Sequence, residues 1–311
     1  MNILVTGGAG FIASQIVDAY IVLGHAVTVI DNLSTGRKEN LNPKADFHEM
    51  DIRDATGVRA LFERRKFALV NHHAAQMDVR RSVADPVFDA SVNIVGMLTL
   101  MEAAVATGVR RVIFASSGGA IYGEQDRFPA DETHATRPIS PYGVAKLATE
   151  EYLYCYKAVY GVDAVCLRYA NVFGPRQNPE GEAGVVAIFA SKMLKGEQPV
   201  INGDGKQTRD YVFVADVVRA NVLALDHARS DILNVGTGIE TDVNRLFAAL
   251  RASTGSSCRE MHGEAKKGEQ QRSVLDNGRI RRELGWRQEV SLEEGIARTV
   301  EFFRARGGHA A

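Results

Sequence analysis

The sequence predicts an α/β fold, with a doubly wound parallel sheet followed by a smaller mixed α/β lobe. Short apolar runs alternate with helical patterns as far as residue 171, and this alternation is typical of a parallel sheet covered by helices. Beyond residue 171 the chain mixes breaker-rich loops with short elements, which predicts a separate lobe over the cleft. The six expected strands are Ile3–Val5, Val27–Ile30, Asp46–Met50, Ala68–Asn71, Arg111–Ala115 and Ala164–Arg168.

The N-terminal stretch has the pattern of a dinucleotide-binding unit. The first strand breaks at Gly7, and a helix follows until Gly24, a residue type favoured just beyond a helix C-terminus. Gly7 permits a tight turn, and Gly10 lets backbone N–H groups and the helix N-terminus approach a pyrophosphate. The pattern departs from the common one at Ala13, where a third glycine is usual. The expected cofactor contacts here are Gly7, Gly10, Phe11 and Ile12.

The second expected strand ends at an acid, Asp31. Its carboxylate can accept hydrogen bonds from both hydroxyls of an adenosine ribose and repels a 2′-phosphate, so the cofactor should be NAD rather than NADP. After the third strand, Asp51 either contacts the adenine amino group or caps the next helix, and the residues favour neither. The expected contacts with the adenosine end are Asp31, Asn32, Ser34, Thr35, Gly36, Asp51 and Ile52.

The fourth expected strand leads into two adjacent histidines. His72 and His73 suggest a metal site, but neighbours on a strand point to opposite faces, so we favour backbone contact with the cofactor and assign no metal. The helical pattern Val83–Thr107 follows and holds a polar residue, Asn93, among apolar ones. The expected cofactor contacts here are His73, Ala74, Ala75, Gln76 and Asn93.

A candidate base lies downstream of a loop of small residues, 116–123. This loop follows the fifth strand at its carboxyl end, where ligands bind in open α/β sheets. A helix opens at Ser140-Pro141, and Tyr142 and Lys146 share one face of it. A tyrosine with its ordinary pKa of ~10 is a poor base at neutral pH, but a nearby ammonium and a positively charged nicotinamide favour the phenolate. Tyr142 would then remove a proton from a substrate hydroxyl as hydride leaves its carbon, while Lys146 bonds the nicotinamide ribose.

Composition disfavours several classes of partner. The 311 residues carry 37 basic and 38 acidic side chains, so the formal net charge of −1 gives no support for nucleic acid or a membrane surface. We expect no secretory signal, because the first strand lies at the start of the chain, and no apolar run long enough to span a bilayer. The cysteines, Cys155, Cys166 and Cys258, lack metal-ligand spacing and fit a reducing, cytoplasmic compartment.

Several motifs together resemble the extended short-chain dehydrogenase/reductase family. They are Gly7-x-x-Gly10, Asp31 to Gly36, Tyr142-x-x-x-Lys146, Arg168 to Arg176 and Asn202 to Val212, and the resemblance covers nearly the whole chain. Within the family the chain is similar to the nucleotide-sugar branch, in particular to prokaryotic UDP-glucose 4-epimerases. The resemblance implies a Rossmann domain of residues 1–171 and about 207–231, with a nucleotide-sugar lobe of about 172–206 and 232–311. It also implies a homodimer that packs the helices Val83–Thr107 and Tyr142–Tyr160, with Tyr152, Tyr154 and Tyr156 at the contact or in the core.

The resemblance implies 4-epimerisation of UDP-hexoses with tightly held NAD. Hydride passes from sugar C4 to NAD, the 4-keto sugar swings about its phosphate link, and the hydride returns to the other face. Arg209 offers a forked donor to the diphosphate, or alternatively forms a surface ion pair with Asp210. Ser116 and Tyr169 join the implied cofactor contacts, and the implied substrate contacts are Met77, Gly118, Asn171, Val185, Val186, Val200, Asn202, Arg209, Lys266, Glu269 and Ser273.

Some positions depart from the family pattern and bear on the chemistry. The family usually has serine or threonine at Gly118 to hold the reacting oxygen; here Ser117 or Ser116 substitutes, or Tyr142 works alone, and we take Ser117 as the third catalytic residue. Lys266 stands where arginine is common, which removes a bidentate contact with the diphosphate. Ser273 falls where bulkier residues restrict the sugar pocket, so we expect room for a 2-acetamido group and turnover of UDP-GlcNAc.

The same loop separates the related reactions. Related 4,6-dehydratases and decarboxylases carry an acid where this chain has Gly119-Ala120, so epimerisation remains. One alternative is an epimerase of another nucleotide sugar, such as a UDP-uronic acid, which needs a cation or hydroxyl cluster near C6 that the sequence does not locate. A second alternative is a catalytically silent NAD-binding sensor, which Gly118 slightly favours and the Tyr142/Lys146 pair disfavours.

Overall fold

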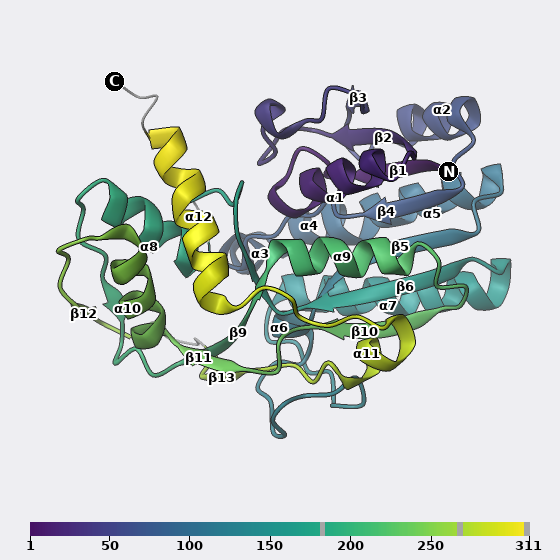
Figure 1. Cartoon of the computed structure of the whole chain (residues 1–311). Coiled ribbons are helices and arrows are strands. Elements are labelled where there is room, and N and C mark those ends of the chain that lie inside the picture. Colours follow the sequence, from purple (N-terminus) through teal and green to yellow (C-terminus); the bar gives the residue numbers. More distant parts are fainter. Residues whose placement is uncertain (181–183, 266–269, 308–311) are drawn as a thin grey trace.

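The computed structural model describes residues 1–180, 184–265 and 270–307. Its larger part is a parallel sheet of seven strands in the order β10-β6-β5-β4-β1-β2-β3 (Figure 1). The winding direction reverses between β1 and β4, and such a switch point is where open α/β sheets bind ligands. The strands are β1 (Asn2–Thr6), β2 (Ala26–Asp31), β3 (Asp46–Glu49), β4 (Leu69–His72), β5 (Arg111–Ser117), β6 (Asp163–Tyr169) and β10 (Asp231–Val235).

The predicted doubly wound α/β fold is confirmed, and each expected strand lies within about two residues of its predicted bounds. The prediction missed β10, which extends the sheet beyond β6. Its sequence, Asp-Ile-Leu-Asn-Val, interrupts a short apolar run with asparagine, so neither alternation nor a continuous run marks it as a strand. The regular alternation of helix and strand therefore continues once more after residue 213.

Helices cover both faces of this sheet (Figure 1). Successive residues of β1 belong to different cores: Ile3 and Val5 pack with α1 and α9, whereas Leu4 packs with α2 and α5. Burial on both faces is why these strands are continuously apolar. The helices are α1 (Phe11–Val22), α9 (Val214–Ala224) and α11 (Gly278–Leu284) on one face, and α2 (Ala55–Arg65), α5 (Gly96–Thr107) and α7 (Pro141–Tyr160) on the other.

The expected helix Val83–Thr107 is wrong at its start and in its interior. Asp85 interrupts it: the Asp85 carboxylate accepts a hydrogen bond of 3.0 Å from the Phe88 N–H and so caps a new helix, which begins at Pro86. A π-helical turn then places Asn93 toward the interior. The observed elements are α3 (Val79–Ala84), α4 (Pro86–Ala90), η2 (Ser91–Val95) and α5.

The same region corrects a second expectation. Among the described residues, the continuous helical run Pro86–Thr107 is long and apolar enough to cross a membrane by length and composition, so the expectation that no run reaches this length was wrong. Met97, Leu100 and Met101 of this run are buried in a core shared with α2 and α7. Its apolar composition is therefore that of a helix packed on the sheet.

The smaller lobe is built around the strand β9 (Thr208–Phe213). Three strands pair with β9, and of these only β11 is antiparallel to it. Helices pack on this sheet around a third core that includes Phe173, Phe213 and Phe247. The elements are β7 (Asn171–Phe173), β11 (Glu240–Asp242), β13 (Arg272–Ser273), the pair β8 (Ile201–Asn202) and β12 (His262–Gly263), and α8 (Val185–Leu194), α10 (Val243–Thr254) and α12 (Leu292–Gly307).

The chain passes between the two lobes more than once, which affects the expected boundaries. β9 belongs to the small sheet and β10 to the large one, so the boundaries expected at residues 207 and 231 each precede a whole strand. We propose boundaries near residues 213 and 235 instead. The remaining short elements are η1 (Lys38–Asn40) and α6 (Gly118–Ile121).

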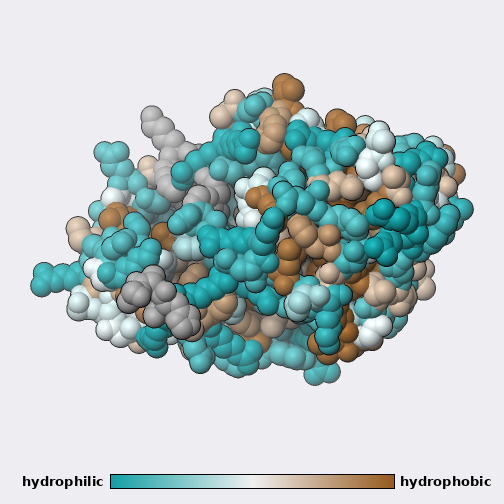
Figure 2. Space-filling view, turned by 90° about the horizontal axis from the view of Figure 1, so that it is seen from above, coloured by the Kyte–Doolittle hydropathy of each residue, from teal (hydrophilic) through white to brown (hydrophobic). Residues whose placement is uncertain are grey.

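The surface is mixed in character. The face seen in Figure 2 is mostly hydrophilic, with hydrophobic side chains between the hydrophilic ones toward its middle and right. This agrees with a chain that is 24% charged and 45% hydrophobic, an ordinary composition for a globular protein with a large core.

Candidate active site

The switch point of the sheet brings the glycine turn against the end of β4. Gly7 has a φ of +70°, and a Cβ atom there would stand 2.7 Å from the backbone nitrogen of Ala74. Glycine is therefore required both by conformation and by contact. Gly10 precedes α1 and provides no side-chain cap, so the first N–H groups of this helix, at the partly buried Phe11 and Ile12, are oriented to bind an anion.

Asp31 lies beside this turn at the end of β2. Its buried carboxylate accepts hydrogen bonds from the N–H groups of Ala9, at 3.0 Å, and Leu33, at 2.8 Å. Burial raises the pKa of Asp31, and these two hydrogen bonds oppose the rise. A Cβ atom at Gly36 would stand 2.8 Å from both carboxylate oxygens, so the loop 32–36 closes directly over Asp31. An uncapped helix N-terminus beside a fixed carboxylate fits NAD and leaves a 2′-phosphate facing a negative charge.

Asp51 does not cap the following helix. The N-terminal cap of α2 is Asp54, which accepts a hydrogen bond of 3.0 Å from Gly57, so the capping interpretation of Asp51 was wrong. Asp51 instead accepts hydrogen bonds from Arg53 and from the Asn32 side chain, which hold the pKa of Asp51 far below its usual range. Asn32 in turn accepts a hydrogen bond of 3.1 Å from the Ser34 N–H. Thr35 adjoins this segment, and Ile52 is buried.

The two adjacent histidines have different partners. His72 shares a 2.7 Å hydrogen bond with the Thr6 hydroxyl, whose oxygen also accepts from the backbone N–H groups of His73 and Ala74. The Nε2 atom of His73 lies 3.1 Å from the hydroxyl of Tyr169. Burial lowers the pKa of each histidine to about 3, and the nearby Lys146 charge adds to this, so both rings are neutral at pH 7. Ala75 follows and is half-buried.

A buried polar cluster explains the polar residue inside the expected helix. Asn93 exchanges two hydrogen bonds with the Gln76 backbone, at 2.8 and 2.9 Å, and both side-chain amides donate to the carboxylate of Asp89. Asp89 is 1% exposed and its charge acts on both Tyr142 and Lys146. Sequence reasoning missed Asp89, because this residue was expected on a long uniform helix. Met77, next to Gln76, is exposed.

Tyr142 and Lys146 lie on α7 as expected, beside β5. Ser140 caps this helix, which confirms its predicted start. The Lys146 Nζ atom donates a 2.7 Å hydrogen bond to the Ala115 carbonyl and lies 5.7 Å from the centre of the Tyr142 ring. Burial lowers the pKa of Lys146 to about 8, and the carboxylates of Asp89 and Glu150 oppose this shift.

The pKa of Tyr142 moves in the direction opposite to that expected. Burial, and then the negative charge of Asp89, raise it to about 12, whereas a hydrogen bond with the Ser117 side chain lowers it. The expected lowering of the pKa assumed a positively charged nicotinamide beside Tyr142. Without that charge, the residues of the chain do not favour the phenolate. The partly buried phenol is therefore protonated at pH 7 until a further positive charge enters the site.

The two serines that precede Gly118 have different roles. The Ser116 hydroxyl donates a 2.6 Å hydrogen bond to the buried carboxylate of Glu150, so it is occupied within the core. Ser117 is the residue whose side chain lies close enough to Tyr142 to lower the pKa of the phenol. Of the alternatives that the sequence left open, the structure thus places Ser117 against the candidate base.

The catalytic loop, residues 116–123, lies against a buried ion pair that sequence reasoning missed. Arg168 at the end of β6 and Glu150 on α7 are 2.5 Å apart, with side chains 4% and 1% exposed. The guanidinium also donates to the hydroxyl of Tyr122 at 3.0 Å, and Tyr122 donates to Asn234 on β10 at 2.8 Å. The available signals were an arginine at the end of an apolar strand and a glutamate four residues after Lys146, on the same face of the helix.

Three of the expected substrate residues, Asn171, Arg209 and Ser273, lie on adjoining strands of the small sheet. Ser273 is the register partner of Arg209, and Asn171 is that of Tyr211. Arg209 donates a 2.8 Å hydrogen bond to the Thr208 carbonyl, while the buried carboxylate of Asp210 accepts from Thr237, Gly238 and Leu275. The side-chain oxygen of Asn171 would lie 3.9 Å from a Cβ atom at Gly119, so the two lobes meet beside the catalytic loop.

Other expected substrate residues differ in accessibility. Val186 is buried in the core of the small lobe, so of the valine pair only Val185, half-buried at the start of α8, can reach a ligand. Val200 is exposed, Asn202 is half-buried in β8, and Ser273 is buried. Lys266 and Glu269 lie outside the described residues.

A family model for the NAD dependent epimerase/dehydratase family matches residues 3–236. The chain belongs to this family. It is 48% identical to the UDP-glucose 4-epimerase of Mycolicibacterium smegmatis, with 98% of this chain and 99% of that protein covered. It also resembles the UDP-glucose 4-epimerase of Thermotoga maritima solved with UDP-glucose (TM-score 0.97, 50% identity, 98% and 99% covered). The Thermus thermophilus UDP-glucose 4-epimerase in complex with NAD is similar as well (TM-score 0.93, 44% identity, both chains fully covered at 100%).

Membership of the NAD-dependent epimerase/dehydratase family agrees with the site as built from its residues. The chain is an enzyme of the isomerase class, and its cofactor is NAD. In this member of the family the cofactor contacts expected at Gly7, Gly10 and Asp31 lie at the switch point of the sheet. The candidate base lies across the same edge, on α7.

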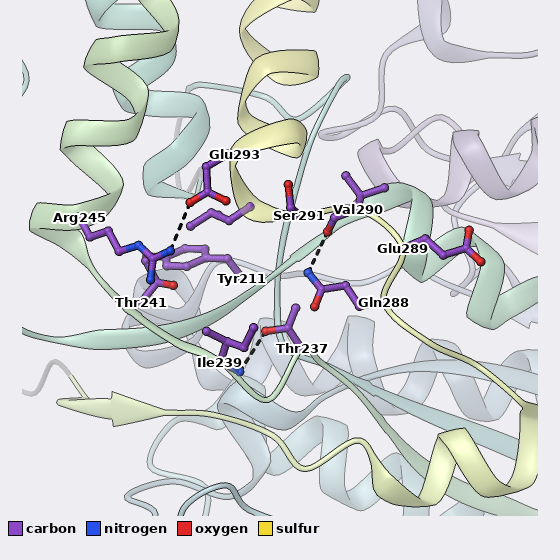
Figure 3. A pocket seen from close by; sticks show the side chains of 11 residues that line it. Tyr211, Thr237, Ile239, Thr241, Arg245, Gln288, Glu289, Val290, Ser291 and Glu293 are labelled. Carbon is purple, nitrogen blue, oxygen red and sulfur yellow. Dashed lines mark hydrogen bonds and ion pairs between the residues drawn. The ribbon is translucent and has the colours of Figure 1, made fainter.

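A hollow lies on the small lobe (Figure 3). It has a volume of about 320 Å³ and lies between β9, β11, α10 and the segment before α12. Arg245 and Glu293 form an ion pair of 3.2 Å at its rim, and Tyr211 lines it from β9. Its lining includes none of the predicted catalytic residues, so we do not assign the reaction to it.

Proposed function

We propose that this enzyme interconverts UDP-glucose and UDP-galactose at C4 through a transient 4-keto sugar. The observation that supports this most strongly is the segment from Ser117 to Ala120, which sets a hydroxyl beside Tyr142 and carries no acid. Elimination of water or of carbon dioxide needs a further proton donor beside the sugar. Epimerisation needs a single group that removes one proton and later returns it, and Tyr142 has the position for both steps.

The residues of the chain divide the work of the first step. Tyr142, as phenolate, takes the proton from the sugar 4-hydroxyl while the C4 hydride departs, and Ser117 holds the same oxygen by a hydrogen bond. When bound, NAD supplies the hydride acceptor and a positively charged nicotinamide ring. Lys146 carries an ammonium close to the ring of Tyr142. The positive charge of the bound nicotinamide would lower the pKa of the phenol from about 12 toward the working range.

Anchoring through the nucleotide leaves the hexose free to turn. Asn171 and Arg209, on adjoining strands of the small sheet, are proposed to hold the diphosphate, with Val185 beside the uracil. After rotation about the phosphate link, the hydride returns to the other face of C4 and Tyr142 gives its proton back to the oxygen. Protons and hydride both balance, so the cofactor remains bound from one cycle to the next.

We further propose that UDP-GlcNAc and UDP-GalNAc are substrates. Ser273 is buried on β13 beside Arg209, and its small side chain supports room for a 2-acetamido group near the nucleotide anchor. On this proposal, tolerance of the 2-acetamido group depends on the small volume of the Ser273 side chain and needs no additional hydrogen bond.

The direct test is conversion of UDP-galactose to UDP-glucose by the purified protein. Tyr142→Phe should lower kcat by about 10²- to 10⁴-fold, the range for loss of a general base. Tyr160→Phe is the matched control, because it removes the same hydroxyl at the exposed end of the same helix. If Tyr142→Phe keeps a rate within a few-fold of the parent, Tyr142 is not the base.

We propose that the chain forms a homodimer in the cytoplasm. Large apolar side chains are exposed on the outer faces of α4 and α7, notably Val87, Val144 and Val159, and a groove of about 580 Å³ lies between these helices. The three cysteines are free thiols, which suits a reducing compartment. Light scattering after size exclusion should give twice 33.9 kDa for the parent and the monomer mass for Val87→Glu combined with Val159→Glu. A parent of monomer mass would contradict the dimer.

A further inference from the structure

Gly118 lies directly against the side chain of Leu275. A Cβ atom at residue 118 would stand 2.6 Å from Cδ1 and 2.8 Å from Cδ2 of this leucine. Non-bonded carbon atoms pack at about 3.5–4.0 Å, so the space for a side chain at 118 is already filled. The neighbouring Gly119 differs: the nearest atom to a Cβ there is the Asn171 side-chain oxygen, at 3.9 Å. The two glycines therefore face different surroundings: the side-chain position of Gly118 is filled by Leu275, whereas that of Gly119 is open toward Asn171.

The side chain of Leu275 has little room to withdraw. It is fully buried, and it packs with Tyr122 and Ala130. A parallel bridge fixes its backbone: the Ala130 N–H donates to the carbonyl before Leu275 at 2.9 Å, and the N–H after it donates to the Ala130 carbonyl at 2.8 Å. Behind it, a Cβ atom at Gly236 would stand 3.0 Å from the Leu275 Cβ. The Ala130 bridge and the close approach of Gly236 together restrict movement of Leu275 away from Gly118.

This packing decides where a catalytic hydroxyl can be placed. With residue 118 unable to carry a side chain, the hydroxyl beside Tyr142 comes from Ser117, and Ser116 is occupied by Glu150. We propose that Leu275 is a positioning residue for the reaction: by filling the space at Gly118, it assigns the hydroxyl that holds the sugar 4-oxygen to position 117. The proposal rests on the proposed function, because it concerns the oxygen that Tyr142 deprotonates.

The packing half of the proposal is tested by unfolding, without turnover. Gly118→Ala should lower the melting temperature by about 5 °C, as overpacking does, and Leu275→Ala should lower it through a cavity. The double variant should lose less stability than the two single variants combined, because the new methyl group fills the cavity and the shorter side chain removes the clash. Gly119→Ala is the matched control and should leave the melting temperature close to that of the parent. Additive losses in the double variant would overturn the pairing of Gly118 with Leu275.

The catalytic half is tested by moving the hydroxyl. Ser117→Ala should lower kcat by about 30-fold in the parent, the size of a lost hydrogen bond to a charged group, with KM little changed. In the Gly118→Ser/Leu275→Ala background a hydroxyl is available at 118, and Ser117→Ala should then lower kcat by no more than about 3-fold. The apparent pKa of the base in the pH–rate profile should rise with Ser117→Ala in the parent and stay constant in that background.

Different failures have different meanings. If Ser117→Ala lowers kcat equally in both backgrounds, the role given to Leu275 is wrong. Turnover of UDP-galactose by the parent would still support the proposed function in that case. A parent that does not convert UDP-galactose would instead refute the proposed function, and the unfolding cycle would still decide whether Leu275 excludes a side chain at 118.

Discussion

Loss of the Glu150 carboxylate should destabilise the enzyme strongly. Three hydrogen bonds join this carboxylate to Arg168, at 3.0, 3.2 and 2.5 Å, and Ser116 donates a fourth. Glu150→Gln keeps the shape of the side chain but leaves the guanidinium as an uncompensated charge in the core. Arg168 would then retain the Tyr122 hydroxyl, which is neutral and already donates to Asn234.

The size of the effect follows from the burial of the pair. Removing one partner of a buried ion pair lowers stability by about 3–5 kcal/mol, because the remaining charge is not solvated. The side chains of Glu150 and Arg168 are 1% and 4% exposed, so the upper part of this range applies. For a chain of this length we expect a fall in the melting temperature on the order of 10 °C.

Urea unfolding followed by circular dichroism measures the free energy directly. Replacing both partners, with Glu150→Leu and Arg168→Met, should recover all but about 2 kcal/mol, because no charge is then left buried. A loss below about 1 kcal/mol for Glu150→Gln, or a double variant as unstable as the two single losses combined, would refute the reasoning.

Other parts of the site give shorter tests. Burial lowers the pKa of Lys146 from 10.5 to about 8, so between these pH values the unfolded chain binds more protons than the folded one. In urea unfolding, the cofactor-free parent should therefore gain stability relative to Lys146→Met as the pH rises from about 8 to 10. A stability difference that stays constant with pH would contradict this. Asp31→Ser should weaken NAD binding by about 10- to 100-fold in titration calorimetry and improve the ratio of NADP to NAD affinity, whereas an unchanged ratio would remove Asp31 as the discriminating residue. Ser273→Tyr should abolish turnover of UDP-GlcNAc while sparing UDP-galactose, and equal loss of both in coupled assays would count against Ser273 as the limit of the pocket.

The features that the sequence predicted well are local ones. The strands of the large sheet are apolar on both faces, so continuous runs marked them. The roles proposed for Gly7, Asp31, Tyr142 and Lys146 rest on spacing within one or two elements. The start of α7 was likewise readable from Ser140 and the proline after it.

The features that it missed depend on contacts between distant segments. The Asp85 cap divides an apolar run whose periodicity alone suggests one helix. Leu275 acquires its meaning from Gly118, and Arg168 from Glu150, although neither pair is close in sequence. The direction of the Tyr142 pKa shift depends on burial and on Asp89, which lies on another helix. Such effects follow from tertiary packing, which residue spacing does not encode.

The way the chain crosses between its lobes has a consequence for motion. Ala170 alone separates β6 of the large sheet from β7 of the small one, and β9 ends at Phe213 where α9 begins at Val214. The bridge between Ala130 and Leu275 adds a non-covalent tie beside the catalytic loop. With such short connections, we expect the lobes to open little as rigid bodies, so a sugar nucleotide exchanges while the NAD groove stays assembled. In the proposed reaction, NAD would then stay bound from one cycle to the next while the hexose turns within a nearly fixed frame.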